Sequence, residues 1–285
     1  MKYCVSSYSF GALAGEDKLG YLGIIDKAAE MGFDGIEFTD GEWVHKGLDC
    51  AYAIKERCEK NGIEPVLLAV GADFINGHDG DSKAVVNGLF KMVDFAAACG
   101  MKKMRHDVTG GIRGRKYSIG YDDAIKILAP CCREVAAYAE EKGIMTCTEN
   151  HGYFSQGAER VEKLINAVAH PNFGALVDLG NFMCADEDPT LSVGVMAPYA
   201  IHVHAKDFYW KSGVEIAPGN GWFMTRAGNY LRGTVIGYGN AKVYQSIQTL
   251  KRAGYNDYLC VEFEGSEDTL TGIQTGLENL KRFVG

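Results

Sequence analysis

The chain has 285 residues, of which 47% are hydrophobic and 23% charged, the balance of an ordinary globular protein with a substantial core. Its formal net charge of −8 argues against a nucleic-acid partner, which would favour a basic surface. No apolar run approaches the length of a membrane span, so we expect no membrane partner either.

The cysteines and the first residues indicate the compartment. There are nine cysteines, an odd number, and no two of them form a CxxC pair. This pattern is typical of free thiols in a reducing compartment. The opening residues MKYCVSSYSF also lack the apolar segment of a signal peptide. We therefore expect a cytoplasmic protein.

A recurring unit organises the chain: an amphipathic helix, a glycine, and a short apolar run that ends in a polar residue. LGIIDKAAEMGFDGIEF (22–38) and FKMVDFAAACGMKKMRH (90–106) are two examples. The apolar runs predict eight strands, at 3–7, 35–39, 65–69, 103–106, 145–149, 174–178, 200–204 and 259–262. Helical spacing predicts eight helices, at 18–31, 48–61, 83–99, 121–142, 157–169, 190–198, 240–253 and 266–283.

The alternation of strands and helices predicts parallel βαβ units and an α/β fold. Eight units in a chain of this length suit a (β/α)8 TIM barrel, with residues 1–285 as a single domain. The competing doubly wound sheet usually has a glycine-rich nucleotide turn after its first strand, and VSSYSFGALAG matches that turn poorly. The interval between the last two strands is unusually long. We predict a long loop at about 207–239 after strand seven, and the alternative is a ninth strand at 234–236.

Polar residues close the predicted strands. They are Glu37, His106, Glu149, Asp178, His204 and Glu262. In a (β/α)8 barrel the carboxyl ends of all strands meet at one mouth, so the last four should converge. Two carboxylates 4 Å apart repel by roughly 4 kcal/mol at an effective dielectric of 20, and a dication among them relieves that repulsion. An oxygen-rich site with one imidazole predicts one divalent metal, Mn²⁺ first, with Mg²⁺, Co²⁺ and Zn²⁺ as alternatives.

Four motifs occur in a fixed order: CTENHG (147–152), LVDLGN (176–181), HVHAKD (202–207) and CVEFEG (260–265). With them the chain resembles the xylose isomerase-like TIM barrels, and within these the sugar phosphate isomerase/epimerase group. The resemblance implies that Glu149, Asp178, His204 and Glu262 bind the metal. It also implies that Glu149 and Glu262 serve as catalytic acid and base on opposite faces of the substrate.

The chain departs from this family at several positions. The epimerases often have histidine three residues after the metal-binding aspartate, and this chain has Asn181. Their arginine shortly after the metal-binding histidine is replaced by Trp210. Arg232, in LRGTVIGYGN, resembles an arginine that precedes the G-x-G of other members. The DxH motif of the family's DNA-repair endonucleases is missing, which argues against a nuclease.

Five further residues are candidates for contact with substrate: His151, Lys206, His106, Glu37 and Arg232. For Lys206 the alternative is an ion pair with Asp207. His202 shares a strand face with His204, and core packing or a hydrogen bond behind that ligand is its alternative to substrate contact. GIRGRK (111–116) is interpreted as a solvated loop or as a phosphate-binding loop.

These observations predict a divalent-metal-dependent sugar isomerase or epimerase. It would act on a keto or aldo sugar, a sugar phosphate or a sugar-like polyol through an enediolate. The alternative is a metal-dependent dehydratase or lyase acting on a keto-sugar, a keto-glycoside or an inosose, because such enzymes share the metal and the base. The expected partner is a small-molecule sugar, and assembly into a homo-oligomer is left open.

Overall fold

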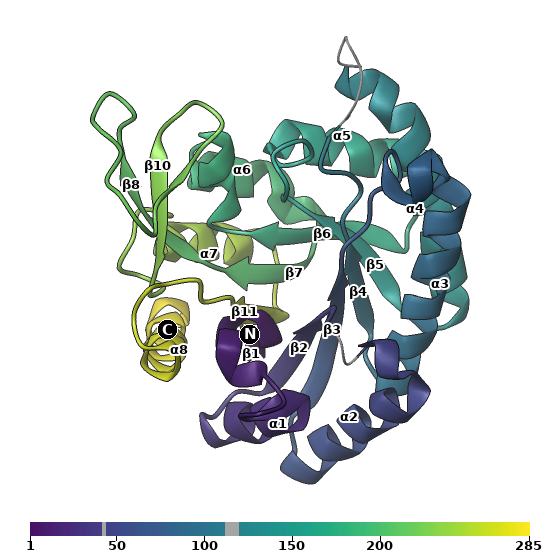
Figure 1. Cartoon of the computed structure of the whole chain (residues 1–285). Helices are drawn as coiled ribbons and strands as arrows, with labels where there is room; N and C mark the ends of the chain where they lie inside the picture. The colour runs from purple at the N-terminus through teal and green to yellow at the C-terminus, as the bar shows by residue number, and fades with distance from the viewer. Residues whose placement is uncertain (42–43, 112–119) are drawn as a thin grey trace.

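The computed structural model describes residues 1–41, 44–111 and 120–285. In this part of the chain, eight parallel strands close into a barrel in the order β1-β11-β7-β6-β5-β4-β3-β2 (Figure 1). The strands are β1 Lys2–Ser6, β2 Gly35–Thr39, β3 Glu64–Val70, β4 Lys103–His106, β5 Met145–Glu149, β6 Phe173–Asp178, β7 Ala200–Ala205 and β11 Tyr258–Val261. The predicted single-domain (β/α)8 barrel is confirmed.

Helices follow the barrel strands and cover the outside of the barrel (Figure 1). The α-helices are α1 Gly20–Glu30, α2 Leu48–Asn61, α3 Ser82–Cys99, α4 Tyr121–Glu141, α5 Ala158–Val168, α6 Pro189–Met196, α7 Val243–Arg252 and α8 Thr269–Val284. Short 3₁₀ helices span Ser7–Ala14, Val44–Lys46, Gly77–Gly80, Asn181–Ala185 and Ala197–Tyr199. No helix in the described ranges combines the length and the apolar composition that crossing a bilayer requires.

Side chains and glycines fix the ends of these helices. Asp81, Asp188 and Asp268 each accept a hydrogen bond from a backbone N–H in the first turn of α3, α6 and α8, which satisfies a donor that the helix leaves free. Gly62 and Gly100 end α2 and α3 with φ angles of 65° and 83°, a left-handed conformation that glycine adopts without steric cost. The two glycines thereby end α2 and α3 just before β3 and β4 begin.

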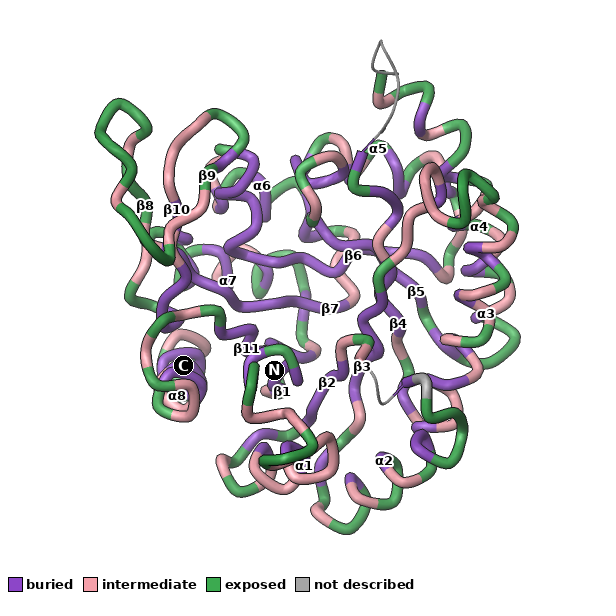
Figure 2. Tube along the Cα trace, in the orientation of Figure 1, coloured by how far each residue is buried: buried purple, intermediate pink, exposed green. Residues whose placement is uncertain are grey.

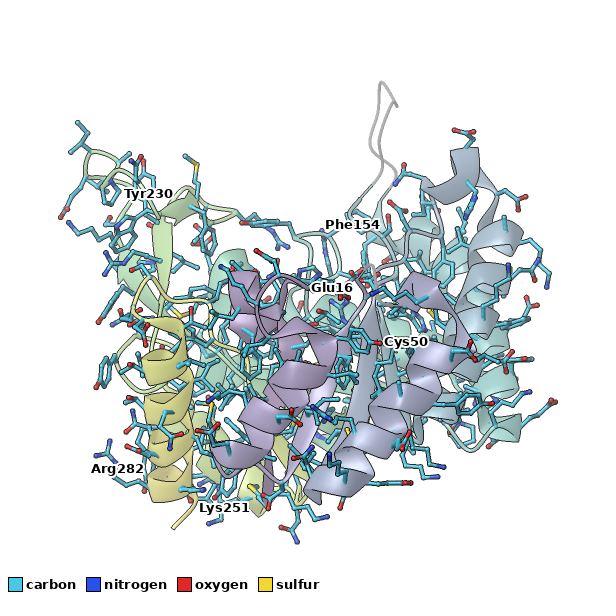
Figure 3. All side chains as sticks on the ribbon, turned by 60° about the horizontal axis from the view of Figure 1, so that its bottom comes forward. Glu16, Cys50, Phe154, Tyr230, Lys251 and Arg282 are labelled. Carbon is cyan, nitrogen blue, oxygen red and sulfur yellow. The ribbon has the colours of Figure 1, made fainter. Side chains whose placement is uncertain are left out.

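The core has two parts. Apolar side chains fill the layer between strands and helices, and a smaller group lies inside the barrel, where Cys147, Leu176 and Cys260 contribute. Figure 2 shows the strands as the buried centre of the molecule. Figure 3 shows Tyr230 and Phe154 at one end of the barrel and Arg282 and Lys251 at the other. Phe154 follows β5, so the first end is the mouth, where the carboxyl ends of the strands meet.

The segment between β7 and α7 differs from its prediction. We predicted a long loop at 207–239, and the structure instead forms a small antiparallel sheet of order β8-β10-β9. Its strands are β8 Asp207–Lys211, β9 Phe223–Met224 and β10 Tyr230–Thr234. Gly233 allows this sheet to pack on the chain after β11, because a Cβ there would lie 1.9 Å from the carbonyl oxygen of Glu264. The small sheet therefore lies beside the mouth of the barrel and projects from it (Figure 1).

Candidate metal centre

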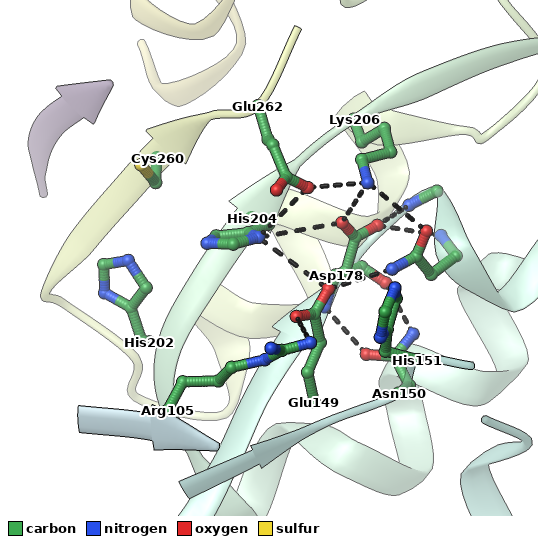
Figure 4. A network of polar contacts seen from close by, with 12 residues as sticks. Arg105, Glu149, Asn150, His151, Asp178, His202, His204, Lys206, Cys260 and Glu262 are labelled. Atoms are coloured by element: carbon green, nitrogen blue, oxygen red, sulfur yellow. Dashed lines mark hydrogen bonds and ion pairs between the residues drawn. The ribbon is translucent and has the colours of Figure 1, made fainter. Parts of the chain in front are cut away.

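The structure brings the four predicted ligands together at the mouth of the barrel (Figure 4). Glu149 and Asp178 are the last residues of β5 and β6, His204 lies near the end of β7, and Glu262 directly follows β11. Each offers one ligand atom, and these four atoms all lie within 4.8 Å of one another. Strand ends that are far apart in sequence thus converge on one point.

These four side chains are almost completely removed from solvent. Their exposed fractions are 0% for Asp178, 1% for His204, 4% for Glu149 and 8% for Glu262. Nδ1 of His204 lies 3.2 Å from a carboxylate oxygen of Glu262 and 3.8 Å from an oxygen of both Glu149 and Asp178. The imidazole nitrogen therefore faces three carboxylates.

Two asparagines brace the ends of β5 and β6. Asn150 accepts a hydrogen bond from the backbone N–H of Asp178 and donates one to its carbonyl, each at 2.9 Å. Asn181 donates to Oε1 of Glu149 at 2.9 Å, and its backbone N–H donates to Oδ1 of Asp178 at 2.8 Å. Asn181 was recognised in the sequence only as a departure from the family pattern. In the structure its side-chain amide contacts Glu149 and its backbone N–H contacts Asp178, so that it links two of the four predicted ligands.

Glu37, which we predicted to contact substrate, lies behind the site instead. It is fully buried, and its Oε2 accepts hydrogen bonds from Nε2 of His204 at 2.9 Å and from Nε2 of His202 at 3.0 Å. When Nε2 of His204 donates to Glu37, Nδ1 is the ring nitrogen that faces the carboxylates and can offer its lone pair to a metal. For His202, the predicted hydrogen bond behind the ligand is present, although its direct partner is Glu37.

Replacing Glu37 with glutamine should lower metal affinity by roughly 10- to 100-fold, the range typical for partners that orient a ligand. Glutamine keeps the shape of the side chain but provides one acceptor where the carboxylate oxygen now serves two imidazoles. Titration of the metal-free protein with Mn²⁺ measures the change. Glu64→Gln, at an exposed ion pair with Lys2 at the start of β3, is the control and should leave the affinity unchanged. Equal affinities in both variants would contradict the orienting role.

The donor set fits a divalent cation. Oδ2 of Asp178 and Nδ1 of His204 are buried and have no hydrogen-bond partner. Burial raises the pKa of Asp178 to about 7, and the carboxylates of Glu262 and Glu149 act in the same direction. A cation among these groups would satisfy both unpartnered atoms and offset the repulsion between the carboxylates. Three carboxylates and one imidazole suit Mn²⁺ or Mg²⁺ and also accept Zn²⁺.

Arg105 is a site residue that the sequence analysis missed. One guanidinium nitrogen lies 2.8 Å from Oε2 of Glu149 and 2.8 Å from Oδ1 of Asp107. Arg105 pairs in register with Cys147, which is two residues before Glu149 on β5. Strand alternation therefore directs both Arg105 and Asp107 into the barrel. The segment KMRHDV has polar residues at alternate positions, Arg105 and Asp107, that could have indicated this face, but we assigned the inward position to His106.

His106 lies on the opposite face of β4, so the structure does not support its predicted contact with substrate. It is fully buried, and its ring packs between Phe74 and Phe173, at centroid distances of 5.7 Å and 5.9 Å. Its Nδ1 donates to the carbonyl of Asp107 at 2.9 Å. Burial lowers the pKa of His106 to about 4, because the charged imidazolium would lose its hydration between these rings.

The depressed pKa of His106 predicts a loss of stability in mild acid. The unfolded chain takes up a proton near pH 6.5 and the folded chain only near pH 4, so the stabilisation is present above pH 6.5 and is lost as pH falls. The contribution lost between pH 7 and pH 5 is about 2 kcal/mol. In His106→Asn the free energy of unfolding should depend less on pH by that amount, measured by urea unfolding. His170→Asn, at a partly exposed position, is the control, and equal slopes in both variants would contradict the assignment.

Lys206 lies inside the site, as a cation among carboxylates. Its Nζ lies 2.6 Å from Oε2 of Glu262, 3.3 Å from Oε2 of Glu264 and 3.5 Å from Oδ2 of Asp178. Burial alone would lower the pKa of Lys206, but these carboxylates raise it well above its usual value. The alternative ion pair with Asp207 is wrong. Asp207 faces away and accepts backbone hydrogen bonds from the chain between β10 and α7.

A cavity of about 570 Å³ opens above the four ligands. Its wall includes Glu149, His204 and Glu262 together with Tyr8, Thr39, Asp40, Arg105, Asp107, His151, Tyr153, Gln156, Asn181, Lys206, Phe208, Phe223 and Glu264. Of the predicted substrate contacts, His151 and Lys206 line this cavity. His151 is 48% exposed, and its Nδ1 lies 3.0 Å from Oδ1 of Asp107.

Arg232 does not line the cavity. It lies on β10, where its guanidinium stacks over the rings of Tyr209 and Trp222. Both rings belong to the segment between β7 and α7, so we do not assign Arg232 a contact with substrate. Most of the basic segment GIRGRK (111–116), for which we considered phosphate binding, lies outside the described residues.

Comparisons with known proteins agree with this architecture. The family model described as xylose isomerase-like TIM barrel matches residues 25–283. No curated protein matches the sequence. Among solved structures, the IolI protein with a bound zinc atom is 18% identical with a TM-score of 0.77, over 100% of this chain and 98% of that one.

Two further solved structures also align over nearly their whole length. The probable 3-DHS dehydratase AsbF from Bacillus anthracis is 17% identical with a TM-score of 0.75, over 99% of each chain. The 3-keto-D-glucoside 4-epimerase YcjR from E. coli is 15% identical with a TM-score of 0.72, over 99% of each chain. At these identities the likeness shows the fold. The family model covers most of the sequence, and the chain therefore belongs to the xylose isomerase-like TIM barrel family.

Proposed function

We propose that this protein is a divalent-metal-dependent isomerase or epimerase of a keto or aldo sugar or a sugar-like polyol. The observation that carries the proposal is the convergence of Glu149, Asp178, His204 and Glu262 at the base of a cavity lined by several charged side chains. Oδ2 of Asp178 and Nδ1 of His204 lack a hydrogen-bond partner there. A divalent cation held by these residues would polarise a substrate carbonyl and so acidify the neighbouring carbon-bound hydrogen. We propose Mn²⁺ first, and the zinc atom named in the IolI structure supports metal binding by a protein of this fold.

The two glutamates are suited to move that hydrogen. Glu149 is paired with Arg105 at 2.8 Å, and Glu262 is paired with Lys206 at 2.6 Å. Each cation holds its carboxylate in place. For Glu262, Lys206 also helps to hold the pKa well below its usual value, which favours the ionised form that can accept a proton. One glutamate would remove the proton from one face of the substrate, and the other would return it on the opposite face. His151 and Lys206 would contact the substrate's hydroxyl groups from the cavity wall.

The charges of the cavity favour an uncharged sugar over a sugar phosphate. Arg105 is paired with Glu149 and Asp107, and Lys206 contacts Glu262 and Glu264. Arg105 and Lys206 are therefore already paired within the described residues of the wall, and neither is free to bind a phosphate. A phosphate dianion would also be repelled by the several carboxylates of the cavity. The neutral compound should therefore react faster than its phosphate ester.

A dehydratase or lyase is the second candidate. The Nζ of Lys206 lies beside Glu262 at the cavity, where it could protonate a leaving group at the carbon next to the one that loses its hydrogen. The structural likeness to a probable dehydratase supports this candidate, whereas the likeness to a 3-keto-glucoside epimerase supports the first. Both reactions begin with removal of the same carbon-bound hydrogen.

Exchange with deuterated water tests both candidates in one experiment. The Mn²⁺-loaded protein is incubated in D₂O with ketoses, inososes and 3-keto-glycosides, each beside its phosphate ester where one exists. We expect deuterium to enter the carbon next to the carbonyl and an epimer or isomer to form. Deuterium entry with loss of water or another leaving group would select the dehydratase or lyase. Absence of exchange with every compound would contradict the proposed function.

Phe223 of β9 should contribute to substrate binding. It lines the cavity and packs edge-on against Phe208 at a centroid distance of 5.5 Å. Phe223→Ala should raise KM by roughly five- to tenfold with little change in kcat, since partial loss of an aromatic contact costs about 1 kcal/mol. The neighbouring Met224 is exposed and absent from the wall, so Met224→Ala is the control. An unchanged KM in Phe223→Ala would show that β9 does not contact substrate.

A further inference from the structure

A second group of metal-binding side chains lies one layer deeper in the barrel. It consists of Cys4, Glu37, His202 and Cys260, and their ligand atoms all lie within 4.8 Å of one another. All four residues have an exposed fraction of 0%, and none of them lines the cavity. Figure 4 shows His202 and Cys260 on the side of the His204 ring away from Asp178. The group therefore lies outside the cavity, and it contacts the upper site through the hydrogen bond between Glu37 and His204.

The sequence places these side chains together by strand alternation. His202 is two residues before His204 on β7, and Cys260 is two residues before Glu262, so both lie on the inner face one layer below the upper ligands. The strands β2, β1, β11 and β7 are consecutive neighbours in the barrel. Cys4 pairs in register with Cys260. Each of four adjacent strands thus contributes one donor to the same layer.

We propose that Cys4, Glu37, His202 and Cys260 form a second metal site, which binds Zn²⁺. Two thiolates, an imidazole and a carboxylate are a donor set that zinc binds tetrahedrally, whereas the oxygen-rich upper site suits harder cations. Sγ of Cys4 lies 4.0 Å from Nε2 of His202, which lies 3.0 Å from Oε2 of Glu37. With bonds of about 2.3 Å to sulfur and about 2.0 Å to nitrogen or oxygen, zinc needs its ligands roughly 3.3–3.8 Å apart. Small side-chain shifts reach that geometry.

The hydrogen bonds of Glu37 support this assignment. Its Oε1 is buried and has no hydrogen-bond partner, although its Oε2 accepts from two imidazoles. An unpartnered buried carboxylate oxygen is costly, and a cation would satisfy it. Binding would replace the bond between His202 and Glu37 with two bonds to zinc. The bond from Glu37 to His204 would remain, so the lower ion would hold the carboxylate that orients the upper ligand.

Cobalt substitution tests the lower site separately from the upper one. A thiolate bound to Co²⁺ gives a charge-transfer absorption in the near ultraviolet, and the upper site contains no sulfur ligand. We expect this absorption in the cobalt-loaded wild-type protein and in Asp178→Asn, which disrupts only the upper site. The double variant Cys4→Ser/Cys260→Ser should lose it. Cys147→Ser is the matched control, because this buried thiol lies inside the barrel but outside the cluster, and it should keep the absorption.

Zinc counting completes the test. Elemental analysis after loading with Zn²⁺ should give two ions per wild-type chain, and one per chain both in Asp178→Asn and in the double cysteine variant. Zinc-edge X-ray absorption of the wild-type protein should show sulfur neighbours at about 2.3 Å, a readout that does not depend on how the variants fold. A wild-type protein without thiolate absorption and without sulfur neighbours would overturn the lower site. That result would leave the proposed function intact, because Asp178→Asn and the deuterium exchange test it independently.

Discussion

Replacing Glu149 or Glu262 with glutamine should lower turnover by about 10²- to 10⁴-fold at saturating metal, or roughly 3–5 kcal/mol of barrier. Glutamine keeps the shape of the side chain and one oxygen donor, but it cannot accept the substrate's proton. If the glutamates served only as ligands, activity would fall in step with metal occupancy. Because each is proposed to move a proton as well, the loss of turnover should exceed the loss of metal.

The two variants should also differ from each other. Since Glu149 and Glu262 are proposed to act on opposite faces of the substrate, one variant should lose hydrogen exchange from one epimer first, and the other variant from its partner. Glu264→Gln is the matched control, because Glu264 lines the same cavity and contacts Lys206 at 3.3 Å without being one of the four ligands. Near-normal turnover in both metal-saturated glutamine variants would remove the two-glutamate mechanism and leave the metal site standing.

Asp178→Asn and His204→Ala should each lower metal affinity at the upper site by at least an order of magnitude. Asp178 directs its unpartnered Oδ2 toward the other ligands while Oδ1 is held by two backbone N–H groups, so asparagine removes the charge and keeps the backbone contacts. His204→Ala removes the nitrogen that faces three carboxylates. Elemental analysis after dialysis against a weak chelator measures occupancy.

Asp107→Asn and His151→Ala provide the matched controls for this experiment. Both residues line the cavity, and neither belongs to the four-residue cluster. Their metal content should match that of the wild-type protein. Full occupancy of the upper site in both Asp178→Asn and His204→Ala would contradict its assignment, whatever the activity of these variants.

Periodicity alone was enough to predict the barrel and the four converging strand ends. Six of the eight α-helices in the described ranges end one or two residues before a glycine, the exceptions being α5 and α6. Most barrel strands are short apolar runs with little competing helical pattern. Glu149, Asp178, His204 and Glu262 follow or close consecutive strands, so the fold brings them together once it forms. This part of the site depends on local signals that the sequence contains.

The inward face of β4 was harder to predict, because a shift of one residue exchanges the two faces of a strand. Arg105 and His106 are adjacent, and both have polar side chains of the kind expected at the mouth of the barrel. The register with Cys147 decides between them, and that register is a contact between strands. Arg105 was therefore missed, and His106 was placed in the site although its ring packs between two phenylalanines.

Two other residues, Glu37 and Arg232, also lie elsewhere than predicted. The reasons are the depth of Glu37 in the barrel and the pairing of β10 with a distant strand. Glu37 does lie in the barrel, but the stagger of the strands places it under His204 and away from the cavity. Arg232 stacks on aromatic rings because β10 pairs with β8 across about twenty residues. The local sequence, rich in glycine and aromatic residues, contains no signal that predicts this pairing. For Glu37 the difference concerns depth in the barrel, and for Arg232 it concerns a strand pairing that we did not predict.

A metal titration followed by deuterium exchange shows whether proton removal from the substrate depends on a cation bound by the four upper ligands. Protein freed of metal at the upper site is titrated with Mn²⁺, and the exchange rate of the best substrate from the D₂O panel is measured at each step. We expect no exchange at the start, a linear rise with bound Mn²⁺, and saturation at one equivalent per chain, with no rise in Asp178→Asn. Exchange at the full rate before any Mn²⁺ is added, or an equal rise in Asp178→Asn, would contradict this dependence.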